Sequence, residues 1–411
     1  MKILVLTLYY EPDVAANAVI MTELVEELVT LGHEITVVTS MPHYAGNVMQ
    51  EAFKGKLFHR ENKGSIKIIR TYLYTSPNKK RFIVRFLNYV SFNLLSTLAG
   101  LFASKHDLIL APSPPLTVGL SAAIIGFLRR TPYVYNVQDI YPDVVVKLEI
   151  LKNKLGITFS KCLERFVYRR AAHITVLSDG FRQNLLRKGV PEEKLNIIPN
   201  FVDTEFIQPM ARENGFRKKL ELDGKHVVLF AGNLGHSQDL YTVLEAAAEL
   251  QEEKELLFLV VGEGSRKPAF KSKAMEFGLE NVRFLPFQPR QDVPEIYASS
   301  DICLVPLKKD IARDSVPSKA YTIMAAGRPI LASVDKNSDI WNLIQDVDCG
   351  ICIPPEDAQS MVESILALHN DSNLRQRYGQ NGREYVTQHF TRQMAGKKYH
   401  ELFTSLICKS S

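Results

Sequence analysis

Short apolar runs of strand length alternate with longer amphipathic stretches along the whole chain. Runs of consecutive apolar residues are typical of strands buried on both faces of a parallel sheet, with helices between them. In the first half these runs read KILVLTL, EITVVTS, IKIIRTY, DLILA, PYVYNV, HITVLS and LNIIPN. In the second half they read HVVLFAG, LLFLVVG, VRFLPF, DICLVPL, PILAS and GICIPP. Two such series predict an α/β protein with two doubly wound domains.

The junction between the two series falls at residues 200–209, after the first set of strands has ended. A chain of 411 residues is also long for one hydrophobic core. We therefore expect a first domain over residues 1–200 and a second over residues 201–389. Residues 390–411 follow the second domain.

The most apolar helix candidate spans residues 82–103. Arg85 and two asparagines interrupt it, so it is a poor candidate for a membrane-spanning helix. Lys79, Lys80 and Arg81 come directly before it, and a basic cluster beside an aromatic-rich helix is typical of a segment that lies in the membrane interface. A core helix of the first domain is the alternative reading.

Charge is unevenly distributed along the chain. Residues 1–200 contain 25 Lys and Arg against 16 Asp and Glu, whereas the rest contains 25 against 29. A basic half suits an anionic partner such as a membrane surface, a phosphorylated ligand or nucleic acid, and it favours the membrane reading of residues 82–103. Five scattered cysteines and an N-terminus without a signal-peptide pattern lead us to expect a cytoplasmic protein, peripheral on the inner face of the cell membrane.

The segment VPSKAYTIMAAGRPILAS carries the first candidate chemistry. Pro317 and Ser318 are typical of a helix start, and Lys319 follows at once. Unpaired N–H groups and a lysine would together attract an anion, with phosphate as the obvious candidate. A solvated lysine at an ordinary helix start is the alternative. Neither a G-x-G-x-x-G motif after the first strand of either half nor a Walker loop is present, which argues against dinucleotide oxidoreductases and P-loop NTPases.

The ordered motifs of the whole chain resemble glycosyltransferase family 4. They are GHEITVVTS, NVQDIYPD, ITVLSDGFRQNLLRKGVPEEKLNIIPNFVDTEFIQP, FAGNLG, VVGEGSRK, VPSKAYTIMAAGRPILAS and CGICIPPED. The resemblance implies the GT-B fold, with two doubly wound Rossmann-like domains facing a cleft, and a retaining mechanism. It also implies that the second domain binds a nucleotide-sugar donor. The last helix, residues 390–411, would return across the first domain.

Within that family the chain is most similar to the bacterial polysaccharide-assembly branch. The resemblance implies a UDP-sugar donor and a polyprenyl-diphosphate-linked sugar acceptor in O-antigen, capsule or exopolysaccharide synthesis, and no nucleic acid. The sugar would be an N-acetylated 6-deoxyhexose such as N-acetylfucosamine. Lys319, with Pro317 and Ser318, would face the donor diphosphate, where charge develops as the nucleotide leaves.

Several positions depart from the family pattern. Many members place two glutamates where this chain has Asp314 and Thr322, so ribose recognition would depend on Tyr321 or Glu263. The FAGNLGHSQDL segment supplies Gly232 and has neutral side chains at two positions that are commonly cationic in the family. These two residues are Asn233 and Gln238, and we consider Arg313, Arg328 and Arg266 as replacements for the lost charge.

In the first domain, Ala15 and Ala16 replace the usual glycine pair before Asn17, and small side chains there still permit a close approach by the donor. Asp139, at the end of a strand, is the candidate that would deprotonate or orient the acceptor hydroxyl. Asp346 and Asp348 form a D-x-D pair expected in a loop before a strand. Because lysine chemistry already serves the phosphate, we expect no required metal or other cofactor.

Two further readings of the function remain open at this stage. One keeps the fold but makes the chain a nucleotide-sugar epimerase or hydrolase, which needs no lipid acceptor. The other is a non-catalytic scaffold of a polysaccharide assembly complex, motivated by Thr322, Asn233 and Gln238. The leading hypothesis is a glycosyltransferase.

Overall fold

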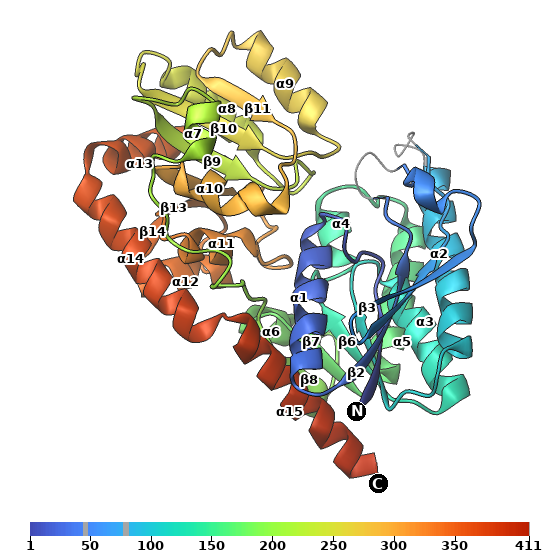
Figure 1. The fold of residues 1–411 in the computed structure, drawn as a ribbon. Helices are drawn as coiled ribbons and strands as arrows, with labels where there is room; N and C mark the ends of the chain where they lie inside the picture. Colours follow the sequence, from blue (N-terminus) through green and yellow to red (C-terminus); the bar gives the residue numbers. More distant parts are fainter. Residues whose placement is uncertain (44–47, 77–81, 411) are drawn as a thin grey trace. The chain divides into compact units, whose positions relative to one another are not determined.

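The computed structural model describes residues 1–43, 48–76 and 82–410 (Figure 1). The chain forms two compact units. The first consists of Met1–Asn200 together with Arg392–Ser411, and the second is Phe201–Thr391. Each unit is an α/β structure around one sheet, which confirms the predicted fold class.

The sheet of the first unit has eight strands in the order β3-β4-β2-β1-β5-β6-β7-β8. All neighbours are parallel except β3 and β4. The strands are β1 (Lys2–Leu6), β2 (Glu34–Ser40), β3 (Phe58–Lys63), β4 (Ile66–Thr71), β5 (Leu108–Pro112), β6 (Tyr133–Val137), β7 (His173–Val176) and β8 (Leu195–Ile197). The central strands are apolar and buried, as continuous apolar runs predict.

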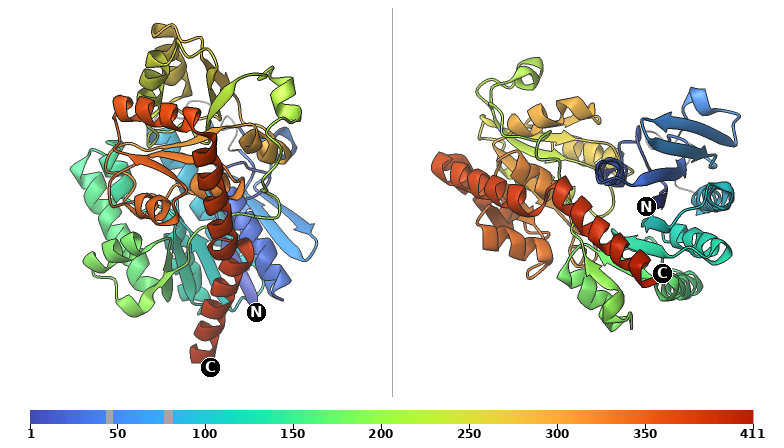
Figure 2. Two further views of the ribbon diagram at one scale, coloured as in Figure 1. Left: turned by 90° about the vertical axis from the view of Figure 1, so that its left-hand side faces the viewer. Right: turned by 60° about the horizontal axis from the view of Figure 1, so that its bottom comes forward.

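Helices cover both faces of this sheet. They are α1 (Ala16–Thr30), α2 (Phe82–Phe102), α3 (Thr117–Arg129), α4 (Asp143–Lys147), α5 (Lys154–Arg170), α6 (Asp179–Arg187) and α15 (Arg392–Ser410). The C-terminal α15 packs against α1, while α2, α3 and α5 lie side by side on the other face (Figures 1 and 2). The strand β3 was not predicted, because FHRENK is polar and only its pairing with β4 makes it a strand.

The sheet of the second unit is wholly parallel, with six strands in the order β11-β10-β9-β12-β13-β14. The strands are β9 (His226–Ala231), β10 (Leu256–Val261), β11 (Val282–Leu285), β12 (Ile302–Pro306), β13 (Ile330–Ser333) and β14 (Gly350–Ile353). Separate clusters of buried apolar residues cover its two faces. Each strand matches one of the apolar runs in the second half of the sequence.

The helices of the second unit connect these strands. They are α7 (Gly215–Lys219), α8 (Leu240–Glu249), α9 (Lys267–Glu276), α10 (Val293–Ala298), α11 (Lys319–Ala325), α12 (Asp339–Val347), α13 (Ala358–Asn370) and α14 (Ser372–His389). Short polar side chains cap several of their N-termini. Ser338 accepts a hydrogen bond from the Trp341 N–H, and Asp371 accepts one from the Leu374 N–H. One-turn 3-10 helices at Glu51–Phe53, Glu192–Lys194 and Arg290–Asp292 complete the two units.

The expected helix at residues 82–103 is α2. In the described part of the chain, no helix is both long enough and apolar enough to cross a bilayer. Lys79, Lys80 and Arg81 lie outside the described residues, and only the backbone of Arg85 is described. The described residues that bear on the membrane-interface prediction are therefore the rest of α2 and its neighbouring helices.

Candidate active site

The candidate donor site lies at the carboxyl edge of the second sheet, where parallel α/β folds hold their ligands. Here β9 ends at Ala231 and continues into Gly232, β10 ends at Val261 and continues into Gly262, and β12 ends at Pro306. Because these three strands are neighbours in the sheet, their end loops meet. This arrangement brings together motifs that are far apart in the sequence.

Two glycines allow the loops after β9 and β10 to cross in close contact. A Cβ atom on Gly262 would lie 1.9 Å from the Gly232 carbonyl oxygen, and one on Gly264 would lie 2.3 Å from the Leu234 carbonyl oxygen. Gly232 and Gly262 also have φ angles of +151°, in the region that favours glycine. The Leu234 N–H donates to the Glu263 carbonyl over 2.8 Å. The closely packed backbones of these two loops therefore form the floor of the site.

Lys319 reaches into this floor from the first position of α11. Its Nζ donates to Gln238 Oε1 over 2.6 Å and lies 4.0 Å from the centre of the Phe230 ring. A Cβ atom on Gly232 would lie only 3.4 Å from that Nζ, so glycine leaves room for the lysine. Among the described residues no carboxylate forms an ion pair with Lys319. In the part of the chain that the structure describes, its charge is therefore not balanced by an acidic side chain.

Burial lowers the pKa of Lys319 to about 7. Removing an ammonium group from water penalises its charged form, and a neutral amide partner compensates only in part. An anionic diphosphate beside Nζ would favour the charged form and raise the pKa again. The protonation of Lys319 is therefore coupled to anion binding near neutral pH.

Asp335 orders the loop that precedes Lys319. Its carboxylate accepts hydrogen bonds from the Asp310 N–H over 2.7 Å and from the Ala312 N–H over 3.1 Å. The Lys308 N–H donates to the Ser237 carbonyl over 3.0 Å, which joins this loop to the one that carries Gln238. Sequence reasoning missed Asp335, because it follows the next strand and only the fold brings it back to residues 310–312.

The remaining expected donor residues are distributed unevenly around Lys319. Gln238 is buried, whereas Asn233 is exposed on the same loop. Pro317 is buried and Ser318 is half-buried, directly before Lys319. The side chain of Glu263 pairs with Lys267, whose Nζ also donates to two carbonyls of the neighbouring loops. Glu263 therefore lies at the edge of the site, and its carboxylate is already paired with Lys267.

Two of the three positions expected near the nucleotide or its sugar are buried. Asp314 is only 1% exposed. Tyr321 is also buried, and its ring packs against Phe390 with the ring centres 4.6 Å apart. Thr322, by contrast, is half-buried. Tyr321, the third residue of α11, therefore belongs to the hydrophobic core.

Two of the proposed replacement cations serve other contacts. Arg266 donates to the Tyr241 hydroxyl over 2.8 Å. Arg328 lies two residues before β13, at the amino edge of the sheet, which is the edge opposite to Lys319. The idea that Arg328 assists the diphosphate was therefore wrong. Arg313 is exposed on the loop before α11 and stays a candidate.

In the first unit, the loop after β1 leads into α1 at the carboxyl edge of the sheet. Ala15 is buried, and Ala16 is exposed as the first residue of the helix. Both polar atoms of the Asn17 amide are enclosed without a hydrogen-bond partner in the described structure. An unsatisfied amide at a strand-end loop is unusual in a folded protein and is consistent with a ligand position.

Asp139 follows β6 at the same edge and is half-buried. Its neighbour Gln138 is held by a buried hydrogen-bond network. Gln138 donates to Asn136 Oδ1 over 2.7 Å and accepts from Asn200 over 2.7 Å. Asn136 in turn donates to Thr175 and to the Tyr399 hydroxyl of α15, each over 2.9 Å. The C-terminal helix therefore helps to fix the strand end that carries Asp139.

Replacing Tyr399 by phenylalanine should destabilise the protein by about 1–3 kcal/mol, because the Asn136 amide loses an acceptor inside the core. The side chain of Tyr399, which carries this hydroxyl, is buried in the folded state. Urea denaturation followed by circular dichroism measures the change. Tyr72→Phe is the matched control, since no hydrogen bond of its hydroxyl is found among the described residues. An equal effect of both variants would contradict the role of the network.

No cluster of three or more His, Cys, Asp or Glu suited to a metal ion occurs in the part of the chain that the structure describes. The expected loop position of the D-x-D pair was wrong. Asp346 lies in α12, and Asp348 is the residue that ends this helix. The Asp348 carboxylate pairs with Arg377 over 3.2 Å, which gives it a structural role.

Two protein-family models match the chain. The model for a glycosyl transferase 4-like domain matches residues 17–200, and the model for glycosyl transferases group 1 matches residues 211–385. A relative in Escherichia coli strain K12, WcaI, is named as a colanic acid biosynthesis glycosyl transferase. It is 28% identical over 411 residues, which cover 96% of this chain and 100% of WcaI.

Solved structures show the same fold at low sequence identity. Sucrose-phosphate synthase from Thermosynechococcus elongatus has a TM-score of 0.76 and 18% identity, with 100% of both chains covered. Anabaena HepE, solved in complex with UDP and glucose, has a TM-score of 0.73 and 18% identity over 98% of this chain and 100% of HepE. The chain therefore belongs to the glycosyltransferases of the GT-B fold, with a 4-like domain followed by a group 1 domain, as the resemblance to family 4 implied.

Proposed function

We propose that the protein is a retaining glycosyltransferase that moves a sugar from a UDP-sugar to a polyprenyl-diphosphate-linked acceptor at the membrane. The observation that carries the proposal is the Lys319 ammonium, which is held by Gln238 above Gly232 without an acidic partner among the described residues. The name of WcaI supports a role in polysaccharide synthesis, and the UDP complex of HepE supports a uridine nucleotide donor. The sugar we propose is an N-acetylated 6-deoxyhexose such as N-acetylfucosamine.

In the proposed reaction the bond between the anomeric carbon and the UDP oxygen breaks, and a bond to the acceptor hydroxyl oxygen forms. Negative charge grows on the departing diphosphate, where Lys319 stabilises it more strongly than in the ground state. The proton of the acceptor hydroxyl passes to the departing phosphate or to Asp139. The anomeric configuration is retained. We propose that no metal ion or other cofactor is required, because Lys319 supplies the positive charge.

The membrane part of the proposal is supported by the outer face of α2, α3 and α5 in the first unit. Large apolar side chains are exposed on all three helices. They are Leu87, Val90, Leu94, Leu98 and Phe102 on α2, Ile124, Phe127 and Leu128 on α3, and Leu155 and Phe159 on α5. No charged residue occurs in residues 87–104 or 117–128. We call this surface the apolar face.

Arginine and lysine border the apolar face. Arg129 and Arg130 end α3, and α5 carries a row of exposed cations that ends with Arg169 and Arg170. The Arg170 guanidinium lies 5.8 Å from the centre of the Phe127 ring. Apolar side chains beside cations complement a bilayer with anionic headgroups. We propose that a bilayer containing anionic lipid is the partner of this face and that the protein is peripheral on the inner face of the cell membrane.

Calorimetric titration with UDP, GDP and dTDP, with and without magnesium, tests the donor site. We expect UDP to bind selectively and equally well in EDTA. Binding should weaken as pH rises above about 7, because free Lys319 then loses its proton and must regain it on binding. The loss approaches about tenfold per pH unit until the raised pKa of the complex is reached. The Lys319→Met variant should show no such slope.

Other outcomes of this titration point to the alternatives. Binding of none of the three nucleotides would contradict the donor site and favour a non-catalytic scaffold. Release of sugar from a UDP-sugar at a rate independent of any acceptor would favour a hydrolase. An inverted anomeric configuration in the product, read by NMR, would overturn the retaining mechanism.

A further inference from the structure

A second site lies at the amino edge of the second sheet, at the end opposite to Lys319. It is a groove of about 560 Å³. One wall is α14, which contributes Ser372, Arg375, Gln376, Gln380 and Arg383. On the side of the sheet lie Asp301, directly before β12, and Arg328, two residues before β13. The segment Pro209 to Arg212 closes the groove.

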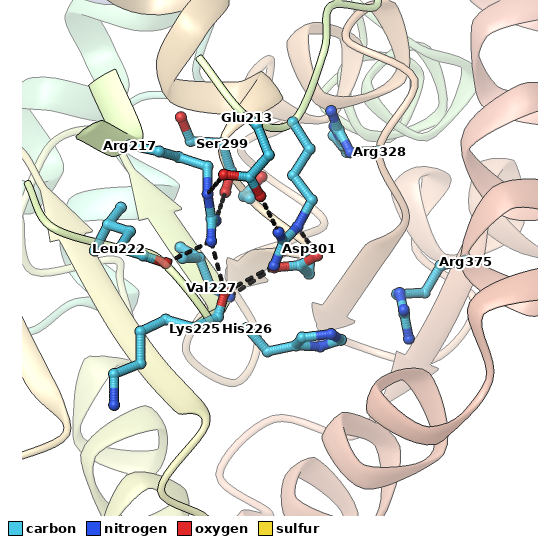
Figure 3. Close-up of polar contacts among 12 residues, drawn as sticks. Glu213, Arg217, Leu222, Lys225, His226, Val227, Ser299, Asp301, Arg328 and Arg375 are labelled. Atoms are coloured by element: carbon cyan, nitrogen blue, oxygen red, sulfur yellow. Dashed lines mark hydrogen bonds and ion pairs between the residues drawn. The ribbon is translucent and has the colours of Figure 1, made fainter. Parts of the chain in front are cut away.

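The groove contains more positive than negative groups. Arg212 forms a bidentate pair with Asp301, with N–O distances of 2.7 and 3.1 Å. Behind it, Arg217 is fully buried and donates to the carbonyls of Ser299, Leu222 and Lys225. Figure 3 shows Asp301 with Arg217 on one side and Arg328 and Arg375 on the other. The groove is therefore lined by four arginines against two carboxylates, buried Asp301 and exposed Glu384, while Glu213 pairs with Arg212 and Arg217.

Arg328 and Arg375 have no carboxylate contact among the described residues. Arg328 donates to the Met210 carbonyl over 3.1 Å, and its Nε is enclosed without a partner. Arg375 donates to the carbonyls of Leu368 and His369. Burial lowers the pKa of both groups, attraction from Asp301 opposes this shift, and repulsion from Arg212 adds to it. Carbonyl oxygens satisfy hydrogen bonds, and Asp301 offsets the two charges only in part, because it is already paired with Arg212.

Partly buried cations whose charge is only partly compensated cost free energy, and an anion that accepts several N–H groups reduces that cost. Guanidinium groups match the oxygens of a phosphoryl group especially well. The groove volume lies in the range of small-molecule sites, and the hydroxyl of Ser372 and the amides of Gln376 and Gln380 offer further polar contacts. The groove therefore combines guanidinium groups that can bind an oxyanion with neutral polar side chains around them.

We propose that this groove binds the phosphoryl group of a small phosphorylated molecule, separately from the donor site. The enclosed Nε of Arg328 and the guanidinium of Arg375 hold the oxyanion, while Ser372, Gln376 and Gln380 contact the neutral part of the ligand. The ligand binds at the opposite edge of the sheet from Lys319. This site does not depend on the proposed transferase activity.

The test uses the full-length protein with its donor site saturated by UDP, at constant ionic strength set with sodium chloride. Inorganic phosphate and glucose 6-phosphate are titrated by calorimetry. We expect saturable binding that the double variant Arg328→Gln, Arg375→Gln weakens at least tenfold. The control is Arg377→Gln, on the same helix, whose exposed side chain points to Asp348 and should leave binding unchanged. Tighter binding of glucose 6-phosphate than of phosphate identifies a phosphorylated sugar, and equal binding identifies a phosphate site.

Hydrogen exchange on the unmodified protein provides a readout that needs no variant. Phosphate should slow amide exchange in residues 209–212 and 327–330 and leave residues 232–238 unaffected. This pattern locates the ion in the groove even if UDP does not bind, so failure of the donor proposal and failure of this one are distinguishable. Protection confined to residues 232–238 and 314–319, or no saturable binding above the chloride background, would overturn the proposal.

Discussion

Replacing Lys319 by alanine is expected to lower turnover by about two to three orders of magnitude, the usual cost of losing one preorganised group that stabilises developing charge. The ammonium is fixed by Gln238 and by the Phe230 ring before any ligand arrives, so its orientation requires no reorganisation during the reaction. The effect should appear mainly in kcat, because the leaving diphosphate carries more charge in the transition state than in the bound donor. UDP release in the presence of the lipid-linked acceptor measures the rate.

Lys309→Ala is the matched control for this prediction. Lys309 is an exposed lysine on the same loop, and its loss removes the same charge without touching the site. Both variants should keep the wild-type circular dichroism spectrum. If the Lys319→Ala and Lys309→Ala variants turned over at similar rates, the role of Lys319 at the leaving diphosphate would be contradicted.

The sequence predicted those parts of the structure that depend on local pattern. The six strands of the second unit coincide with apolar runs, because a strand buried on both faces needs a continuous apolar segment. Lys319 was identified because Pro317, Ser318 and the following helix formers are neighbours in the chain. The polar strand β3 was missed, because its only signal is the partner strand β4.

The contacts that complete the site come from residues far apart in the chain, and no local pattern identifies them. Gln238 and Lys319 are separated by 81 positions, and Asn136 and Tyr399 by 263. The same limit explains why Arg328 was considered as a replacement cation for the diphosphate. In the sequence, Arg328 lies in the Gly-Arg-Pro segment that follows α11. Only the direction of β13 shows that this segment lies at the edge of the sheet opposite to Lys319.

The apolar face yields the second large prediction, which concerns membrane binding. Phe102, Phe127 and Phe159 are 80%, 71% and 70% exposed, respectively, and lie on three neighbouring helices. Burying a large apolar side chain contributes about 1.5–3 kcal/mol, so three rings inserted together account for a loss of several orders of magnitude when they are removed. The triple variant Phe102→Asp, Phe127→Asp, Phe159→Asp should therefore fail to sediment with vesicles of phosphatidylcholine and phosphatidylglycerol.

Two comparisons separate insertion of the rings from a general effect of added charge. Met275→Asp changes an equally exposed apolar residue, at 78%, in α9 of the second unit, and should leave sedimentation unchanged. Wild-type binding should weaken when salt is raised or when the anionic lipid is left out, because the arginines beside the apolar face contribute about 1 kcal/mol each near an anionic surface. A triple variant that sediments like the wild type would mean that the membrane does not cover this face. In that case three helices with a shared apolar surface would need a protein partner, since an exposed surface of this extent marks an interaction site.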